Sequence, residues 1–379
     1  MMARLGDVCE ILNGFAFKSE QYVNSGIRII RISNVQKGYI EDNTPVFYPI
    51  ENRDAQKYML SDGDLLISLT GNVGRVALLE EKFLPAALNQ RVACLRVKNE
   101  ATLNKKFLFD FLNTDCFEKM CIASSKGVAQ KNMSTEWLKK CEIPLLPLQR
   151  QLQIAYTLDT LSSLISLRRQ QLAKLEELVK ARFVEMFSAC TQKDKLGNMV
   201  SISRGASPRP ISAYVTEDID GVNWIKIGDV SENSLYIERT KEKITLEGAK
   251  KSRYVYKGDF ILSNSMSFGR PYILNIDGCV HDGWLIISDY LATFHPLYLY
   301  YAIRDFEVQR QFSEKVNGAT VKNLNSDLVK STLIKVPPME LQRQFSESVL
   351  KMEQTKLTIQ QSLDKLELLK KSLMQEFFG

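Results

Sequence analysis

Residues 148–187 read LQRQLQIAYTLDTLSSLISLRRQQLAKLEELVKARFVEMF, and a second copy, residues 341–378, reads LQRQFSESVLKMEQTKLTIQQSLDKLELLKKSLMQEFF. Neither stretch contains Gly or Pro, and both are rich in Leu, Gln, Glu and Lys, which lose little conformational entropy in a helix. Both stretches are therefore predicted to form long α-helices. At about 1.5 Å of rise per residue, each helix is expected to be roughly 60 Å long.

Apolar side chains recur in both copies at alternating steps of three and four residues. In the first copy these are Leu158, Leu161, Ile165, Leu172, Leu175, Val179 and Met186, and in the second Phe345, Val349, Met352, Ile359, Leu363, Leu366, Leu373 and Phe377. This period is typical of a helix that pairs with another helix. The vacant seam positions hold the cations Arg168, Arg182, Lys356 and Lys370. Such a cation either extends to the surface or fixes the register of the pair, and the sequence leaves both explanations open.

The whole chain is duplicated, not only the helices. Six pairs of matching segments follow one another in the same order, offset by 191 to 195 residues: 4–8 with 195–199, 28–35 with 223–230, 61–68 with 256–263, 74–75 with 269–270, 127–134 with 318–325, and 143–144 with 336–337. An ordered series of this kind indicates an internal repeat. Each half is therefore predicted to be a globular domain followed by a long helix.

The globular part of each half has the character of an α+β domain. Short β-branched runs, typical of strands and separated by Gly-containing turns, occur at 29–32, 65–69, 76–79, 92–97, 224–227, 259–262 and 272–276. One stretch with helical spacing follows in each half, at 105–121 and 296–312, and prolines at 144, 147, 337 and 338 then end each domain before its long helix. The predicted organisation is a first domain at 1–147, a long helix at 148–190, a second domain at 191–338 and a long helix at 339–379.

Composition is that of a folded, mildly basic protein. The net charge of +6 is compatible with a polyanionic partner but too small to establish one. Seven single cysteines without a CxxC pair, and only two histidines, give no zinc-ligand spacing and favour a reduced, cytoplasmic setting. No secretory signal is apparent. The longest apolar segment, 284–303, contains Asp289, His295 and Pro296 and is predicted to be a strand, a turn and a helix rather than a membrane span.

Signatures of catalysis are largely missing. The sequence contains no GxxxxGK[ST] phosphate loop, no GxSxG elbow and no HExxH motif. Asp64, Glu80 and Lys82 match the carboxylate pair and lysine of metal-dependent nucleases, in which the acids hold Mg²⁺. The duplicate stretch has Asp259 but no second acid or lysine, so a turn that opens a strand accounts better for both copies. We therefore predict no catalytic and no metal-binding residue.

Polar loops with a lysine or arginine recur in both halves. Residues 124–132 and 316–323 are rich in small and amide side chains, and residues 69–75 and 264–270 connect two strands and end in Gly-Arg. Lys and Arg neutralise phosphates, and amides or Arg can bridge base edges in the major groove. Each residue alone has a structural alternative in a turn or helix cap, but the set predicts a DNA-binding face. Its candidate residues are Lys18, Asn72, Arg75, Lys126, Gln130, Lys131, Arg209, Ser267, Arg270, Thr320, Lys322 and Asn323.

Taken together, these motifs make the chain resemble the specificity (S) subunit of type I restriction–modification enzymes. Both halves contain, in order, a Leu-Gly opening, a [KR]-I-x-[ND]-V strand, a G-D-[LF]-[LI]-[IL]-S strand, a GxxxKN loop and an LQRQ helix behind a Pro-rich entry. The opening loops, 13–19 and 204–208, are also similar to loops common in that family. The resemblance covers essentially the whole chain.

The resemblance implies two similar target recognition domains separated by two long helices in an antiparallel coiled coil, with internal pseudo-two-fold symmetry. Each domain would read one half of an asymmetric bipartite target in double-stranded DNA, and the coiled coil would set the spacer. Partners would do the chemistry: two methyltransferase (M) subunits methylate adenine with S-adenosylmethionine, and restriction (R) motor-nuclease subunits cleave. ATP and Mg²⁺ belong to the partners as well, so no cofactor is expected on this chain.

The predicted function is thus a non-catalytic DNA sequence-recognition subunit. Two alternatives come from other classes: a self-contained metal-dependent nuclease that uses Asp64, Glu80 and Lys82, and a coiled-coil adaptor that binds only proteins. Methyl transfer by the isolated chain would contradict the first hypothesis. Loss of cutting in an Asp64→Ala variant would favour the nuclease, and the absence of salt-dependent DNA affinity would favour the adaptor.

Overall fold

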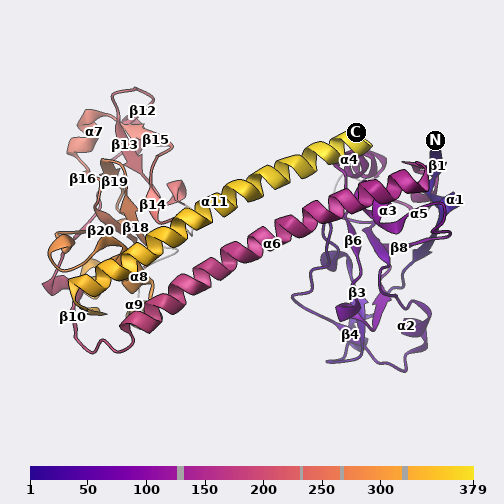
Figure 1. Cartoon of the computed structure of the whole chain (residues 1–379), viewed down its shortest axis with the longest axis horizontal. Coiled ribbons are helices and arrows are strands. Elements are labelled where there is room, and N and C mark those ends of the chain that lie inside the picture. The colour runs from indigo at the N-terminus through magenta and orange to yellow at the C-terminus, as the bar shows by residue number, and fades with distance from the viewer. Residues whose placement is uncertain (126–131, 231–233, 265–268, 318–322) are drawn as a thin grey trace. The chain divides into compact units, whose positions relative to one another are not determined.

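Two compact units make up the computed structural model, which describes residues 1–379 apart from 126–131, 231–233, 265–268 and 318–322 (Figure 1). Unit 1 contains Met1–Arg169 and Gln361–Gly379, and unit 2 contains Gln170–Gln360. The boundary runs through both long helices, so each unit contains about half of each helix.

The two long helices are confirmed. Helix α6 spans Leu148–Phe187 and α11 spans Met339–Phe378, 40 residues each. Both begin directly after a proline, and α11 therefore starts two residues before its LQRQ motif. The carbonyl oxygens of Pro147 and Pro338 accept the first backbone hydrogen bonds of the two helices. Proline serves well here because its missing N–H group would have no partner at a helix start.

Within unit 1 the two helices run antiparallel. Lys370 Nζ of α11 donates to Ser162 Oγ of α6 at 2.8 Å, and Arg169 Nη2 of α6 lies 2.6 Å from Glu367 Oε1 of α11. Residue numbers thus fall along α11 as they rise along α6.

The helix segments in unit 2 are antiparallel as well. The rings of Phe187 and Phe345 lie 5.4 Å apart, and Lys356 Nζ lies 3.9 Å from Glu176 Oε1 of the opposite helix. All fifteen predicted apolar seam positions of the two copies are buried or half-buried. Because Lys356 and Lys370 both reach the opposite helix, the structure favours a role in register for these two seam cations.

Each long helix is fastened to its domain by a fully buried glutamine. In unit 1, Gln151 Oε1 accepts from the backbone N–H of Asn104 at 2.8 Å, and Gln151 Nε2 donates to the carbonyl oxygens of Thr102 (2.9 Å) and Leu146 (2.7 Å). One side chain therefore satisfies three backbone groups that burial would otherwise leave unpaired.

Gln342 makes the same three bonds in unit 2, accepting from His295 N–H (2.8 Å) and donating to the carbonyl oxygens of Thr293 (3.0 Å) and Pro337 (2.9 Å). The two glutamines are 191 residues apart, and each lies four residues after the proline that precedes its helix. The buried glutamine is the fourth residue of the first LQRQ motif but the second residue of the other. Matching the two identical motifs residue by residue is therefore wrong by two residues.

Unit 1 is built from one four-stranded sheet and one three-stranded sheet within the described residues. The antiparallel larger sheet has the order β2 (Cys9–Asn13), β8 (Val92–Val97), β5 (Leu65–Ser68), β6 (Val76–Leu78). The smaller sheet has the order β4 (Phe47–Tyr48), β3 (Ile27–Ile30), β7 (Ala86–Leu88), with β3 and β7 parallel. A separate pair joins β1 (Met2–Arg4) to β9 (Glu142–Pro144). The helices are α1 (Leu5–Val8), α2 (Arg53–Lys57), α3 (Lys105–Leu112), α4 (Asp115–Ser124) and α5 (Thr135–Lys140), with short 3₁₀ turns at Ser19–Gln21, Ile32–Asn34 and Glu81–Phe83.

Unit 2 repeats this plan with two larger sheets. One has the order β11 (Ser201–Arg204), β20 (Trp284–Ser288), β17 (Phe260–Ser263), β18 (Pro271–Leu274), β14 (Tyr236–Ile237). The other has the order β12 (Val215–Thr216), β15 (Glu242–Ile244), β13 (Val222–Ile225), β19 (Gly278–Val280), β16 (Arg253–Val255). Strands β10 (Lys193–Lys195) and β21 (Leu333–Lys335) form the separate pair. The helices are α7 (Leu246–Lys250), α8 (Pro296–Arg304), α9 (Phe306–Asn317) and α10 (Ser326–Lys330), with 3₁₀ turns at Leu196–Asn198, Ile211–Ala213, Ile227–Asp229 and Tyr290–Ala292.

The predicted strands are all present, with ends displaced by up to two residues. The single helices predicted at 105–121 and 296–312 are wrong, because each is two helices with a break between them. In unit 1, α3 ends at Leu112 with Asn113 as its C-cap, and Thr114 caps α4, its side chain accepting from the Phe117 N–H. In unit 2 the break falls at Asp305. The stretch 284–303 is a strand, a turn and a helix, as predicted.

A hydrophobic core in each unit joins one sheet to the long helices, the four-stranded sheet in unit 1 and the sheet that contains β11, β20, β17 and β18 in unit 2. In unit 1 the Phe378 ring of α11 packs 5.3 Å from Phe107 and 5.8 Å from Phe111 of α3. In unit 2 the Phe187 ring of α6 packs 4.8 Å from Tyr298 of α8 in the same way.

All seven cysteines are free thiols. In the described part of the chain, we find no helix with the length and apolar character needed to cross a membrane.

A buried carboxyl group lies at the junction of α3 with the long helices. Asp110 is 6% exposed, and its Oδ2 atom has no hydrogen-bond partner among the described residues. Burial raises the pKa of Asp110 to about 7, although Lys106 and Lys370 oppose the shift. Burial also lowers the pKa of the Lys370 ammonium group. In unit 2 the duplicate position, 191 residues later, holds Tyr301.

Replacing Gln342 with Ala should destabilise unit 2 by about 3 kcal/mol, because three buried backbone groups lose their partner. Urea unfolding followed by tryptophan fluorescence measures this, since Trp224 and Trp284 are both buried in unit 2. The matched control is Gln344→Ala, which removes an exposed glutamine of the same motif. Equal unfolding midpoints for the two variants would contradict the assigned role.

The buried carboxyl group should make unit 1 less stable as the pH rises. Asp110 has a higher pKa in the folded than in the unfolded chain, so its contribution is fully present below about pH 4 and is lost as the pH rises to about 7. The urea midpoint of the wild type should therefore fall between pH 5 and pH 8 more steeply than that of Asp110→Asn. Parallel pH profiles for the two proteins would show that Asp110 is not buried as described.

Candidate nucleic-acid interface

Residues 132–133, at the end of the predicted polar loop 124–132, lie beside the loop 69–75 of unit 1. The loop 69–75 connects β5 to β6, and the Leu69 carbonyl oxygen accepts from the backbone N–H of Met133 at 2.8 Å. Thr70 forms an isolated antiparallel bridge with Asn132. Asn132 and Met133, just before α5, are therefore held against the start of the loop that ends in Arg75. Residues 126–131 of the loop 124–132 lie outside the described residues.

Arg75 lies in a polar network at the end of this loop. Its Nη1 atom donates to the Gln36 side-chain oxygen, and Gln36 Nε2 donates to the Ser33 carbonyl oxygen at 3.0 Å. The Asn72 amide, oriented with its oxygen toward Arg75, accepts from both Nη atoms at 3.2 Å. Arg75 is half-buried, and these contacts restrict the orientation of its guanidinium group.

Unit 2 has the same arrangement of backbone bonds. The Leu324 N–H donates to the Asn264 carbonyl oxygen at 2.9 Å, which matches the Met133–Leu69 bond of unit 1. The Arg270 N–H donates to Ser263 Oγ at 3.1 Å, as the Arg75 N–H does to Ser68 Oγ at 3.0 Å. The arginine that ends each loop therefore has its backbone fixed by a buried serine.

The glycine before each of these arginines is required by close packing. Gly74 and Gly269 have positive φ angles of 84° and 78°. A Cβ atom on Gly74 would lie 2.7 Å from the Cys121 Cβ atom of α4, and one on Gly269 would lie 2.8 Å from the Phe312 ring of α9. The Gly-Arg pairs thus close the hairpins, and each glycine packs against a helix. This confirms their structural role, and their role in DNA binding stays a prediction.

A third turn, residues 90–91 in unit 1 and 282–283 in unit 2, lies beside Leu69 and Asn264 and was not predicted from the sequence. The Leu69 N–H donates to the Arg91 carbonyl oxygen at 2.9 Å, and in unit 2 the Asn264 N–H donates to the Gly283 carbonyl oxygen at 3.1 Å. Gln90 and Arg91 are exposed and join the candidates of unit 1. The two turns share no residue type, so only their common position before a buried strand could have pointed to them.

The remaining candidates lie in several places. Lys18 is exposed in the opening loop of unit 1, and that loop meets the third turn because the Gln90 N–H donates to the Phe15 carbonyl oxygen at 2.9 Å. Arg209 is exposed, with Nη2 3.9 Å from the Asp282 carboxylate. Asn323 is exposed just before α10. The candidates Lys126, Gln130, Lys131, Ser267, Thr320 and Lys322 lie outside the described residues.

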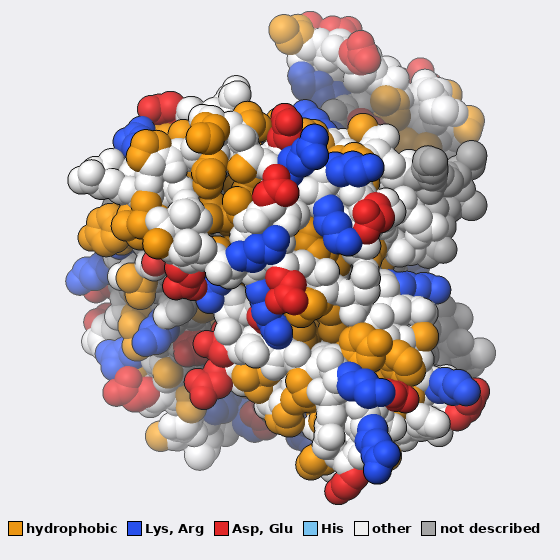
Figure 2. Space-filling model, turned by 90° about the vertical axis from the view of Figure 1, so that its right-hand side faces the viewer, with side chains coloured by type: hydrophobic (Ala, Val, Ile, Leu, Met, Phe, Trp, Pro, Cys, Tyr) orange, Lys and Arg blue, Asp and Glu red, His pale blue; other side chains and the backbone are white. Residues whose placement is uncertain are grey.

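Two titratable groups near the loops of unit 2, Asp282 and His281, keep the same charge above neutral pH. The Ser207 hydroxyl donates to Asp282 Oδ1 at 2.6 Å and lowers the pKa of that carboxyl group. Burial lowers the pKa of His281, so its imidazole is neutral at pH 7. On the face of the molecule in Figure 2, Lys and Arg side chains are interspersed with Asp and Glu and form no continuous patch of one sign.

The nuclease pattern receives no support from the geometry. Arg96 donates to both oxygens of the Asp64 carboxylate, from Nε to Oδ1 at 2.8 Å and from Nη2 to Oδ2 at 2.7 Å. The Ser61 N–H also donates to Oδ2, at 2.8 Å. Glu80 pairs instead with Lys82 at 2.8 Å. Among the residues whose placement is described, no cluster of three or more His, Cys, Asp or Glu side chains could hold a metal ion.

Asp259 of unit 2 repeats the structural role of Asp64. Its carboxylate accepts from the Tyr256 N–H at 2.9 Å, as Asp64 accepts from Ser61 three residues before it. A turn that opens a strand therefore explains both copies.

Comparison with known proteins places the chain among DNA specificity proteins. The family model described as type I restriction modification DNA specificity domain matches residues 1–177 and again residues 192–368. The specificity subunit of the type I restriction enzyme EcoBI from Escherichia coli is 25% identical over 382 residues, covering 90% of this chain and 76% of that protein. The EcoAI specificity subunit of Escherichia coli is 35% identical over 165 residues, covering 42% of this chain and 27% of that protein.

Solved structures show the same fold. The S subunit of a type I restriction–modification system from M. genitalium has a TM-score of 0.61 at 15% identity, covering 100% of this chain and 96% of that chain. A chain from a structure on complex assembly and conformational transition of the type I restriction–modification system has a TM-score of 0.62 at 17% identity, with coverage of 100% and 97%. The predicted fold class, α+β with two similar domains and long paired helices, is confirmed.

Replacing Asp64 with Asn should lower the stability of unit 1 by about 2 kcal/mol, because Arg96 loses its charged partner and the buried Asp64 position loses its ion pair with the half-buried arginine. Glu80→Gln, at an exposed pair, should change stability by less than about 0.5 kcal/mol. Thermal unfolding of the two variants measures the difference. A nuclease would behave in the opposite way: Asp64→Asn would fold normally and lose Mg²⁺-dependent cutting.

Proposed function

The chain belongs to the family of type I restriction–modification DNA specificity domains and contains two copies of that domain, and from this we propose that it is a DNA sequence-recognition subunit for a bipartite target. Each domain reads one half of an asymmetric site in double-stranded DNA, and the long helices determine the number of base pairs between the halves. The chain itself is non-catalytic. Two methyltransferase subunits methylate adenine with S-adenosylmethionine, and restriction subunits that use ATP and Mg²⁺ cleave.

The observation that supports this proposal best is the loop assembly found in both halves. The same backbone bonds, Met133 to Leu69 and Leu324 to Asn264, bring a strand-to-strand loop against the segment before a short helix. The side chains on these loops differ between the halves: residues 69–75 read LTGNVGR, and residues 264–270 read NSMSFGR. A shared frame with different side chains is what two different half-sites require.

Arg75 is the residue of unit 1 that is best placed to read a base. A guanidinium group offers two parallel N–H donors that match the O6 and N7 acceptors of guanine in the major groove. The contacts with Gln36 and Asn72 hold the group in one orientation before DNA binds, which reduces the entropy lost on binding. Arg91 and Gln90, on the adjacent turn, are exposed and can contact phosphates or further base edges.

Exposed apolar side chains on the long helices support the proposed protein partners. In unit 1 these include Leu152, Tyr156, Leu167 and Leu368, with Tyr156 76% and Leu368 70% exposed. Leu178, Val184, Leu350 and Leu357 play the same part in unit 2. Large apolar groups in water are typical of protein–protein contact sites, so we assign these helix faces to the methyltransferase subunits.

Arg75→Ala should change the target at one half-site only. Loss of one bidentate base contact costs about 1–3 kcal/mol, so methylation of the wild-type sequence should fall by about ten- to a hundredfold, with relaxed selection at one base pair. Mapping methylated adenines in cells that express the chain with its partners measures this. Arg53→Ala, at an exposed arginine that begins α2, is the control. Unchanged methylation in Arg75→Ala, or a change in the half read by unit 2, would contradict the assignment.

A further inference from the structure

A cavity of about 1050 Å³ lies in unit 1 between α4, α6 and the last turns of α11. The charged side chains that line it are five cations, Lys37, Lys119, Arg169, Lys370 and Lys371, and two carboxylates, Asp115 and Glu367. The lining therefore has more positive than negative groups, in a hollow large enough to admit part of another molecule.

Two of the cations are engaged within the protein. Lys37 Nζ lies 2.7 Å from Asp115 Oδ1 and 2.8 Å from Glu118 Oε2, both on α4. Arg169 pairs with Glu367 at 2.6 Å. The Lys37 pairs join the segment around Lys37 to α4, and the Arg169 pair joins α6 to α11. These ion pairs therefore stabilise the walls of the cavity, and they engage both carboxylates of its lining.

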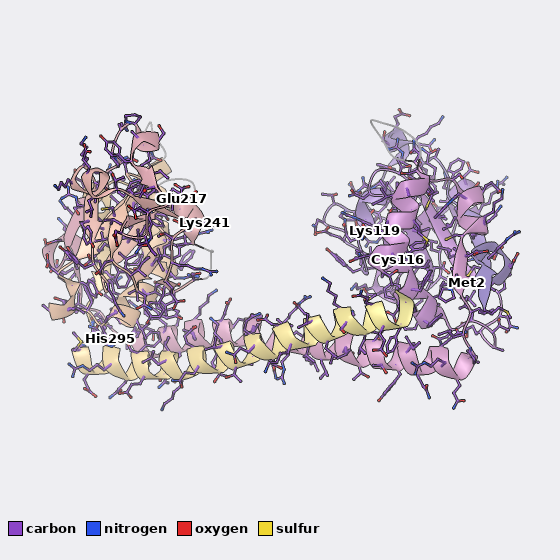
Figure 3. The ribbon with its side chains drawn as sticks, turned by 90° about the horizontal axis from the view of Figure 1, so that it is seen from above. Met2, Cys116, Lys119, Glu217, Lys241 and His295 are labelled. Atoms are coloured by element: carbon purple, nitrogen blue, oxygen red, sulfur yellow. The ribbon has the colours of Figure 1, made fainter. Side chains whose placement is uncertain are left out.

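The other three cations form no ion pair with a carboxylate among the described residues. Lys119 and Lys371 are exposed, and neither forms an ion pair within 4 Å in the part of the chain that the structure describes. Lys370 donates to Ser162 Oγ rather than to an acid. Figure 3 shows Lys119 on α4, one turn after Cys116. An excess of positive charge is therefore left at the cavity.

The cavity is continuous with the loop 69–75 through one short segment. Lys37 follows Gln36, whose side chain accepts from Arg75, and the Gly38 N–H donates to the Val76 carbonyl oxygen at 2.8 Å. Residues 36–38 thus touch the Arg75 loop on one side and α4 on the other. A ligand whose base edges meet Arg75 can place its backbone toward Lys119.

The duplicate corner of unit 2 has a different lining. Its cavity, about 490 Å³, is lined by aromatic side chains that include Phe183, Tyr300, Tyr301 and Phe306. The residues 191 positions away from the unit 1 cations are Val179 for Lys370, Gln360 for Arg169 and Arg310 for Lys119, and Arg310 pairs with Glu314 at 3.4 Å. Lys371 corresponds to Lys180, which lines the unit 2 cavity together with Arg304 and Lys356, and three carboxylates, Glu176, Asp305 and Glu353, line it as well. Within the described residues, the excess of cations over carboxylates in the lining is thus found in unit 1 and not in unit 2.

We propose that the cavity between α4, α6 and α11 in unit 1 binds phosphate groups of the DNA backbone that flank the bases read by the Arg75 loop. This rests on the proposed function and adds a binding site to it. Lys119 and Lys371 provide the main contacts, because neither forms an ion pair with a described carboxylate. The hydrogen bond from Lys37 lowers the pKa of nearby Asp115, and Lys119 and Lys371 lower it further. Contacts of this kind neutralise phosphates whatever the base sequence, so they strengthen binding and position the duplex without altering the target.

The double variant Lys119→Ala/Lys371→Ala tests the site in the assembled complex with the methyltransferase subunits. Fluorescence anisotropy over a range of KCl concentrations gives the slope of log affinity against log salt. Removing two phosphate contacts should reduce the magnitude of this slope by about 2 and weaken binding equally for target and non-target duplexes. The methylated sequence should stay the same.

The matched control is Lys180→Ala/Arg310→Ala, which changes the duplicate positions in unit 2. Its salt slope should equal that of the wild type. All four side chains are exposed, so thermal unfolding of both variants should match the wild type. An unchanged slope in the unit 1 variant, or the same reduction in the unit 2 variant, overturns the proposal.

A second measurement separates DNA from a small anionic ligand. Titration calorimetry measures the binding of pyrophosphate alone to the wild type and to the Lys119→Ala/Lys371→Ala variant. We expect no pyrophosphate binding that is present in the wild type and lost in the variant. Such binding, together with an unchanged DNA slope, would assign the cavity to a small phosphate compound and overturn the proposal. A wild-type complex without sequence-selective methylation would overturn the proposed function, whereas selective methylation with an unchanged slope overturns the cavity assignment alone.

Discussion

The rest of the structure depends on apolar packing of the long helices against α3 in unit 1 and against α8 in unit 2. Phe378 against Phe107 in unit 1, and Phe187 against Tyr298 in unit 2, bury large aromatic groups at this junction. Burial of such surface supplies the driving force, at roughly 25 cal/mol per Å². It also removes water from nearby backbone groups, and Gln151 and Gln342 supply the hydrogen bonds that those groups then need.

The loops proposed to read DNA depend on this frame rather than on their own sequence. Ser68 and Ser263 fix the backbone of the arginine that ends each loop, and the glycine before it packs against Cys121 of α4 or Phe312 of α9. These anchors occupy backbone and small side chains only. The larger side chains of the loops are left free to differ, so one frame can present two different chemical surfaces.

Duplication also allowed the two helix junctions to become different. At matching positions, unit 1 has Asp110 and Lys370 where unit 2 has Tyr301 and Val179. Both junctions bury aromatic rings, but at these positions the unit 1 junction contains a carboxyl and an ammonium group whose pKa values burial shifts, and unit 2 has no charged group there. Because the seam cations stand at different positions in the two helices, the antiparallel pair is not symmetric in chemistry even though it is built from a repeat.

The sequence by itself determined the long helices, their seam, the internal repeat and the strands, because periodicity and propensity are local properties that neighbouring residues express together. It also supported the structural explanation of Asp64 by comparison with Asp259. Tertiary structure decided which glutamine of each LQRQ motif is buried, since that depends on which one faces the unpaired backbone groups of its domain and not on its place in the motif. It decided that Arg96, 32 residues further along the chain, neutralises Asp64, and that Arg75 meets Gln36 beside the turn of Gln90 and Arg91. Such contacts join residues far apart in the chain, and no local pattern encodes which of them meet when the core closes.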